Sequence, residues 1–241
     1  MEILNQTISF VANGIPYNIP IMRKVIATNS EYNGLNIKEI EPQIAFDSIN
    51  TTENKKELIE KIKKQIPIAI FADQDLMISI NNNENQLNIT GSIDTRDSNI
   101  FCEIFESLLK SNIENFGQLN SVVLTYTRIV NAKNEKLKLL NEELENINNW
   151  TKNKTFILTI PFEYDDYIVS FKIQKLLPKN KNNLDRTYQF SGIFNFNFMD
   201  LNLKQEKLKQ ILQNYSDHVY SKLFQEKYTE FMSLKYETEK Q

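Results

Sequence analysis

The stretch Thr187-Tyr188-Gln189-Phe190-Ser191-Gly192-Ile193-Phe194-Asn195-Phe196-Asn197-Phe198 decides the fold. Aromatic rings occupy its alternate positions, with Gly192 the one gap, and the positions between the rings are mostly polar. Side chains alternate between the two faces of a β-strand, so this pattern predicts a strand with one aromatic face and one polar face. A single strand face with so many rings requires a thick core opposite it.

The sequence after this strand predicts one long helix over residues 203–232. Asn202 can cap the helix, and Gln205 three residues later completes a capping-box pattern. Apolar side chains then recur at helical spacing: Leu208, Ile211, Leu212, Tyr215, Val219, Leu223, Phe224, Tyr228, Phe231 and Met232. The simplest structure packs this apolar stripe on the aromatic strand. Three rings are therefore expected to be buried against the helix and to bind no ligand: Phe194, Phe196 and Phe198.

The composition is that of a globular protein. The 241 residues are enough for one large domain or two small ones, and 41% of them are hydrophobic, so a sizeable core is available. No apolar run approaches the roughly 20 residues that a membrane-spanning helix needs, and the N-terminus lacks the pattern of a signal peptide. Cys102 is the only cysteine, which excludes an intrachain disulfide. These features predict a cytosolic protein without a membrane segment.

The first part of the chain is predicted to consist mainly of strands. Three of them are expected at residues 3–11, 19–27 and 35–46, and a lysine-rich helix that ends at Pro67 follows.

The next part repeats the order of strands and helix. Alternating apolar residues over 76–80 and 87–93 predict a β-hairpin, and a helix capped by Asp97 or Ser98 follows it. A further strand is predicted at 122–130.

Residues 134–149 are expected to form a different kind of helix, which connects two parts of the chain. Four apolar residues lie three or four positions apart between charged flanks: Leu137, Leu140, Leu144 and Ile147. The stripe lasts only two heptads, which is short for a coiled coil. The helix either packs on the domain and bridges its two halves or forms a dimer contact.

The second half is predicted to be a strand meander followed by the long helix. Residues 156–162 and 167–173 alternate apolar and polar side chains on either side of a turn. Strands joined by tight turns favour an α+β fold with antiparallel sheets packed against helices, in two sheet-and-helix halves. The predicted divisions are an N-terminal α+β half at 1–133, a connecting helix and linker at 134–154, and a meander plus long helix at 155–241.

No motif carries chemistry by itself. His218 is the only histidine and is expected to be structural, and Cys102 falls in an apolar helical pattern that predicts burial. The five glycines form neither a phosphate-binding loop nor a Gly-x-Ser-x-Gly motif. The acidic pairs Asp165-Asp166 and Glu142-Glu143 fit a turn and a solvated helix face. The sequence therefore predicts no catalytic residue, no cofactor and no metal site.

Basic residues gather in two clusters, each of which is either a solvated face or a patch for an acidic partner or for phosphates. The first is on the helix before Pro67 and consists of Lys55, Lys56, Lys61, Lys63 and Lys64. The second consists of Lys172, Lys175, Lys179, Lys181 and Arg186. The net charge of −3 disfavours nucleic acid as the partner, because nucleic-acid binders usually carry a basic excess.

Three features resemble an uncharacterised family of sporadically distributed bacterial cytosolic proteins of similar length. These features are the strand at 124–129, the aromatic strand ending at Asp200, and the closing helix with His218, Phe224 and Thr229. The resemblance runs from about residue 68 to residue 232. It implies a bacterial intracellular protein linked to mobile elements or defence, and it brings no catalytic residues.

Three hypotheses for the function follow. The first is a non-enzymatic interaction protein that binds another protein, or itself through residues 134–149. The second is binding of nucleic acid or phosphate through the lysine clusters, which would weaken steeply with salt. The third is an enzyme with an unrecognised site, which a deep polar pocket around His218 would favour.

Overall fold

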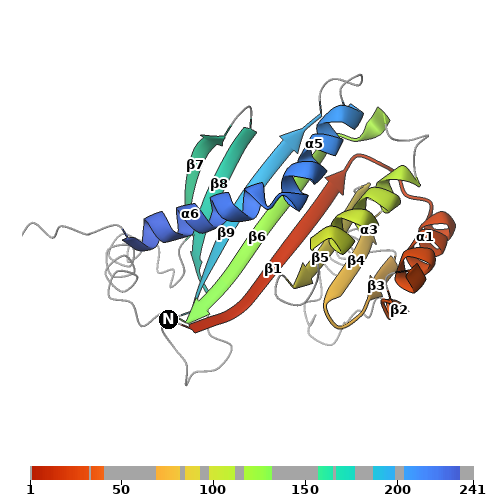
Figure 1. Ribbon diagram of the computed structural model, residues 1–241, viewed down its shortest axis with the longest axis horizontal. Helices are drawn as coiled ribbons and strands as arrows, with labels where there is room; N and C mark the ends of the chain where they lie inside the picture. Colours follow the sequence, from red (N-terminus) through yellow and green to blue (C-terminus); the bar gives the residue numbers. More distant parts are fainter. Residues whose placement is uncertain are drawn as a thin grey trace, which may run out of the picture. The chain divides into compact units, whose positions relative to one another are not determined.

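A computed structural model describes residues 2–32, 34–40, 69–81, 85–92, 98–111, 117–131, 157–164, 167–176, 187–198 and 204–233 (Figure 1). The elements are, in chain order, β1 (Glu2–Asn13), α1 (Ile19–Tyr32), β2 (Lys38–Ile40), β3 (Ala69–Ala72), β4 (Leu76–Asn81), β5 (Gln86–Ser92), α3 (Ser98–Lys110), β6 (Ser121–Asn131), β7 (Ile157–Tyr164), β8 (Tyr167–Lys175), β9 (Thr187–Asn197), α5 (Lys204–Ser216) and α6 (Val219–Ser233). The chain is α+β, as the sequence predicts. None of the described helices has the length and apolar character that crossing a membrane requires.

The described strands form a single nine-stranded sheet in the order β2-β3-β4-β5-β1-β6-β9-β8-β7. Both predicted hairpins are present, since β4 pairs antiparallel with β5 and β7 pairs antiparallel with β8. The prediction of more than one sheet, in two sheet-and-helix halves, is not confirmed, because the described strands join one sheet. Periodicity identifies the two faces of a strand but does not identify its neighbours, so it could not show that all the strands join one sheet.

The order of the strands beside β1 mirrors the order of the strands beside β6 on the other side of the sheet. On one side the meander β3-β4-β5 ends beside β1, and on the other side the meander β7-β8-β9 ends beside β6. Each meander is followed in the chain by a helix, α3 in the first case and α5 in the second. Apart from β2, the two halves of the described sheet thus follow the same strand order.

The chain divides into two compact units. Unit 1 comprises Met1–Ile8, Leu124–Asn195 and Gln213–Gln241, and unit 2 comprises Ser9–Val123 and Phe196–Leu212. The predicted connecting helix at 134–149 lies outside the described residues, so the predicted domain boundaries stay predictions.

The core of unit 1 is aromatic. Helix α6 runs across β6, β9 and β8 (Figure 1). The ring of Phe194 lies 5.0 Å from that of Tyr220, and the ring of Phe190 lies 5.0 Å from that of Tyr228, edge to face. Gly192 lets α6 approach β9, because a Cβ atom there would lie only 2.8 Å from Cδ2 of Phe224.

The core of unit 2 is mainly aliphatic. In this unit Phe10 on β1 stacks against Phe105 on α3, with ring centroids 4.7 Å apart. The aliphatic side chains of this unit with at most 1% exposure include Ile78, Ile80, Leu87, Ile89, Ile104, Leu108, Leu109 and Ile211. Helices α1 and α3 lie on the same face of strands β3 to β5 (Figure 1).

The predicted burial of the aromatic strand is confirmed. Phe194, Phe196 and Phe198 are 1%, 0% and 5% exposed. Phe194 packs on α6, and the ammonium of Lys207 on α5 lies 5.8 Å from the ring centroid of Phe198. These rings are core side chains.

The predicted strand at 19–27 is wrong, because these residues belong to α1. Asn18 caps the helix, since its backbone carbonyl accepts from Met22 N at 3.0 Å and its Oδ1 accepts from Ile21 N at 3.3 Å. Pro20 lies in the first turn, where proline is tolerated. The buried residues Met22, Ile26 and Ser30 lie four positions apart, so helical spacing decides the structure here over the strand propensity of the isoleucines.

The predicted single helix at 203–232 is divided into α5 and α6. His218 has a φ of 59°, the left-handed conformation that ends a helix. Its N–H donates to the carbonyl of Tyr215 at 2.9 Å, and its own carbonyl accepts from Lys222 N in the next helix. The apolar stripe continues through this turn, so the spacing of apolar residues did not reveal it.

Candidate binding site

The predicted lysine patch lies outside the described residues: Lys55, Lys56, Lys61, Lys63 and Lys64. Two lysines of the second cluster are described, and both lie on β8. Lys175 is 7% exposed on the helix-covered face, whereas Lys172, three residues away, lies on the opposite face. These two lysines therefore do not form a common basic surface.

The other residues considered for catalysis are not brought into a site. Cys102 is buried, and its Sγ lies 3.8 Å from the carbonyl oxygen of Leu212 as a weak donor, so it is the small buried residue that the sequence predicts. His218 is exposed in the turn between α5 and α6. Asp165-Asp166 and Glu142-Glu143 lie outside the described residues. No group of three or more potential metal ligands occurs in the described part of the chain.

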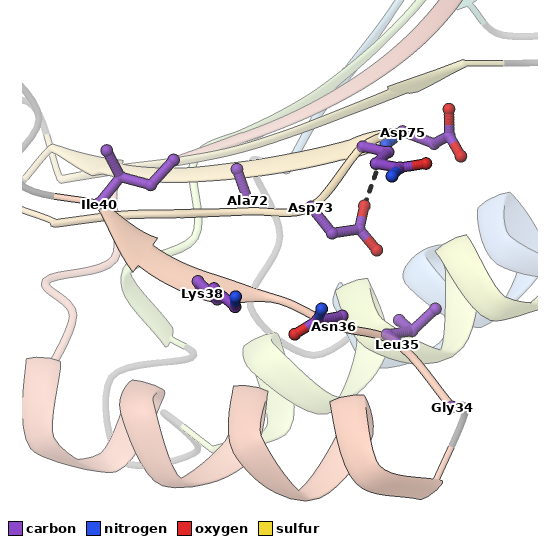
Figure 2. Close-up of a pocket in the computed structure, with 9 residues that line it drawn as sticks. Gly34, Leu35, Asn36, Lys38, Ile40, Ala72, Asp73 and Asp75 are labelled. Carbon is purple, nitrogen blue, oxygen red and sulfur yellow. Dashed lines mark hydrogen bonds between the residues drawn. The ribbon is translucent and has the colours of Figure 1, made fainter.

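A pocket of about 530 Å³ opens in unit 2 beside β2 (Figure 2). Two segments that are distant in sequence form it, the connection from α1 to β2 and the turn from β3 to β4. The lining residues are Gly34, Leu35, Asn36, Lys38, Ile40, Ala72, Asp73, Gln74 and Asp75. Its volume falls within the range of about 300–1,000 Å³ typical of ligand sites.

The first wall is fixed by the end of α1. Gly34 has a φ of 63°, its N–H donates to the Glu31 carbonyl, and Leu35 N donates to the Ser30 carbonyl at 2.8 Å. These two bonds form a Schellman motif, in which glycine is favoured because it has no Cβ. The buried Ser30 hydroxyl also donates to the Leu35 carbonyl at 2.6 Å and accepts from Ile37 N.

The second wall is fixed by Asp73. Its Oδ1 accepts from the backbone N–H groups of Asp75 and Leu76, both at 3.0 Å. An aspartate that binds the backbone of the following residues closes a tight turn. In Figure 2, Asp73 extends from this turn toward the segment that carries Leu35 and Asn36. Both walls are therefore held by local hydrogen bonds without a ligand.

The open face of the sheet next to the pocket is apolar. Paired residues of neighbouring strands lie on the same face, and the register pairs Ile40 with Ile70, and Ala72 with both Lys38 and Met77. Ile40 and Met77 are 48% and 43% exposed, whereas Phe71 and Ile78 on the opposite face are buried. We call Ile40, Ile70, Ala72 and Met77 the β2 patch.

The rim of the pocket carries polar side chains of both charge signs. In the described part of the chain, four lining side chains make no hydrogen bond or ion pair: Asn36, Lys38, Gln74 and Asp75. Figure 2 shows the Asp75 carboxylate directed away from Lys38. An ammonium, a carboxylate and two amides around an apolar patch can bind both donors and acceptors of a ligand.

The two terminal strands of the sheet differ in how far they can accept another strand. β7 contains Pro161, which lacks the N–H group that a further strand would need. β2 contains no proline and is exposed at all three positions. Its Glu39 is held on the helix-covered face by Arg23 of α1, with Nη2 2.7 Å from Oε1. The β2 edge is therefore the better site for an added strand.

Sequence reasoning did not identify this site. The signals that could have found it are Gly34 after a helix and the Asp-Gln-Asp sequence at 73–75, since both residue types favour turns. The pairing of β2 with β3 brings the two turns together. No sequence pattern near either strand indicated this pairing.

Comparisons with known proteins found no match. No protein-family model, no curated protein and no solved structure is detectably similar to this chain.

Proposed function

We propose that the protein is a non-enzymatic protein-binding protein, and that unit 2 binds an extended segment of a partner beside β2. The observation that carries this proposal is a preformed pocket next to an exposed edge strand and an exposed apolar patch. A segment that adds to a sheet edge gains affinity from backbone hydrogen bonds and specificity from pockets for its side chains.

The β2 patch supplies the apolar part of the contact. Full burial of an isoleucine or methionine side chain is worth about 1.5–3 kcal/mol. Ile40 and Met77 are already about half buried, so covering them would contribute roughly 1 kcal/mol each. This small gain needs the backbone hydrogen bonds along β2 and the polar rim as well.

The rim selects the chemistry of the partner segment. Lys38 attracts a carboxylate and Asp75 attracts a cationic group, and both line the same pocket. The bound segment should therefore carry an apolar side chain between charges of opposite sign. A nucleic acid, which is uniformly anionic, would match only the Lys38 side.

The test is selection from a library of host-proteome peptides displayed on phage, with three forms of the protein. The double variant Ile40→Asp/Met77→Asp places charges in the β2 patch. The matched control is Ile21→Asp, because Ile21 is exposed to a similar extent, 43%, on α1 of the same unit. We expect the wild type and the control to select the same apolar peptides flanked by both charges, and the double variant to lose them.

Two outcomes would contradict the proposal. One is selection of the same peptides by the double variant, with circular dichroism showing all three proteins folded. The other is selection of no peptide class by the wild type, together with binding of single-stranded nucleic acid that weakens steeply as salt increases.

The cellular setting is part of the same proposal. The composition and the resemblance to the sporadically distributed bacterial family support a cytoplasmic protein of bacterial mobile elements or defence. Recovery of the selected peptide's parent protein from such a system would support this setting.

A further inference from the structure

Arg128 on β6 has an unusual environment in unit 1. Its guanidinium donates from Nε and Nη2 to the side-chain carbonyl of Gln6, at 3.1 and 2.9 Å. The side chain is half-buried on the face of β6 that α6 covers. Gln6, on the neighbouring strand β1, thus fixes the orientation of the guanidinium plane.

Aromatic rings of α6 cover the same guanidinium. Its central carbon lies 4.6 Å from the ring centroid of Tyr228 and 5.6 Å from that of Phe224. Burial raises the pKa of the Tyr228 hydroxyl, while the charge of Arg128 and a hydrogen bond to it act in the opposite direction. The hydroxyl therefore stays protonated, and uncharged, at neutral pH.

All these partners of Arg128 are uncharged. Ion pairs in the described part of the chain include Arg23 with Glu39, Lys110 with Glu106, and Lys227 with Glu230, whereas Arg128 forms no ion pair there. Arg23, more exposed at its side chain, has a carboxylate partner, whereas the half-buried Arg128 has none in the described part of the chain. Buried charges are normally paired, so this distribution is the reverse of the expected one.

We propose that Arg128 binds an oxyanion, either the carboxylate or the phosphate group of a ligand. A guanidinium presents a planar fork of N–H groups that matches both groups; Gln6 accepts from Nε and Nη2 only, and the Tyr228 hydroxyl is a further hydrogen-bond partner. This site is in unit 1 and is independent of the peptide site proposed beside β2.

The experiment is calorimetric titration of the full chain with inorganic phosphate, pyrophosphate and citrate at constant ionic strength set with chloride. The variants are Arg128→Lys, which keeps the charge and loses the fork, and Arg128→Gln, which loses both. The matched control is Arg23→Gln, which removes an arginine that already has a carboxylate partner.

We expect at least one anion to bind the wild type and the Arg23→Gln control with equal affinity. Binding should weaken by about tenfold in Arg128→Lys and by more in Arg128→Gln, as expected for loss of a bidentate contact and then of the charge. Stronger binding of phosphate and pyrophosphate than of citrate would assign the ligand group as a phosphate, and the reverse order would assign a carboxylate.

Two results would overturn the proposal. The first is no heat of binding for any of the three anions with the folded wild type at millimolar concentration. The second is equal binding by Arg128→Lys and the wild type. In either case Arg128 only links β6 to α6 through its aromatic contacts, and Arg128→Gln would lower the melting temperature equally with and without phosphate. Arg128→Lys, which retains a cation over the rings, keeps the test valid if Arg128→Gln does not fold.

Discussion

Apart from the edge strand β2, the two units use the same strand order, but they fill their cores with different side chains. Unit 1 packs aromatic rings of β6, β8 and β9 against rings of α6, with centroid distances of 5.0 Å for Phe194 and Tyr220 and 6.1 Å for Phe171 and Phe224. Unit 2 buries mainly isoleucine and leucine side chains, together with rings such as Phe10, which stacks on Phe105. Aromatic and aliphatic cores are therefore both compatible with this strand order. The order depends more on where apolar residues occur in the sequence than on whether they are aromatic or aliphatic.

The two units also differ in which neighbouring atoms require a glycine. In unit 1 a glycine, Gly192, makes room for a ring of α6. In unit 2 the critical glycine, Gly14, makes room for backbone, because a Cβ there would lie 2.4 Å from the Gln118 carbonyl oxygen. The aromatic core of unit 1 thus needs a residue without a Cβ within the strand β9 itself.

The largest expected effect comes from removing one ring from each unit. Phe194 in unit 1 and Phe196 in unit 2 are neighbours on the same face of β9 and are 1% and 0% exposed. Each alanine substitution should cost about 3–5 kcal/mol of unfolding free energy. Since domains are stable by only about 5–15 kcal/mol, either variant should come close to unfolding. Urea denaturation followed by circular dichroism measures the change.

The control for these variants is Ile193→Ala on the opposite face of the same strand, where the side chain is half-buried. We expect a loss of about 1 kcal/mol or less there. A melting-temperature shift of less than about two degrees in Phe196→Ala would show instead that this ring is not part of the core.

The two glycine positions should give smaller and unequal effects. Gly14→Ala combines a φ of 100° with a clash against backbone, which cannot move without displacing the strand, so we expect a loss of about 3 kcal/mol. Gly192→Ala meets the Phe224 ring at 2.8 Å, and a ring can shift, so we expect a loss of about 1–2 kcal/mol. Thermal melts of both variants compare them, and equal losses would contradict the distinction between backbone and ring.

The smallest expected effect appears at alkaline pH. Burial raises the pKa of Tyr17 in unit 2, so the folded state keeps a proton that the unfolded chain releases above about pH 10. The resulting stability is complete below about pH 10 and is lost as the pH rises toward the folded pKa. Tyr17→Phe should therefore flatten the decline of stability above this pH. Tyr228→Phe in unit 1 should flatten it less, because Arg128 opposes the effect of burial there.

Urea midpoints between pH 8 and pH 11 would measure these slopes, with absorbance at 295 nm reporting tyrosinate formation. An identical pH dependence in Tyr17→Phe and the wild type would contradict the prediction for Tyr17.

Sequence patterns correctly predicted the elements in which apolar residues recur at one regular spacing. The aromatic face of β9 and the alternation in β4 and β5 have the spacing of strands, and they are strands. The pattern failed at α1, where isoleucines favour a strand while Asn18 and the four-residue spacing of buried side chains favour a helix. The pattern of apolar residues also failed at His218. One residue in the left-handed backbone conformation ends α5 there, while the apolar stripe continues into α6.

The candidate site was not predictable for a different reason. The pocket exists because Lys38 pairs with Ala72 across a long stretch of sequence, and apolar spacing contains no information about such a pairing. Arg128 was likewise unremarkable as one cation in a strand. Its position matters only because Gln6, on the neighbouring strand, lies on the same face.

The place of β1 in the sheet affects how the protein folds during synthesis. β1 lies between β5 and β6, and its Asn13 bonds to Ser121 of β6, 108 residues later. At a translation rate of about 5–20 residues per second, roughly 5–20 seconds separate the synthesis of these two residues. During that interval Ile8, Phe10 and Ala12, all buried in the finished protein, have a neighbour on one side at most. A nascent chain that stops before Ser121 would therefore expose an apolar strand edge to chaperones and to other nascent chains.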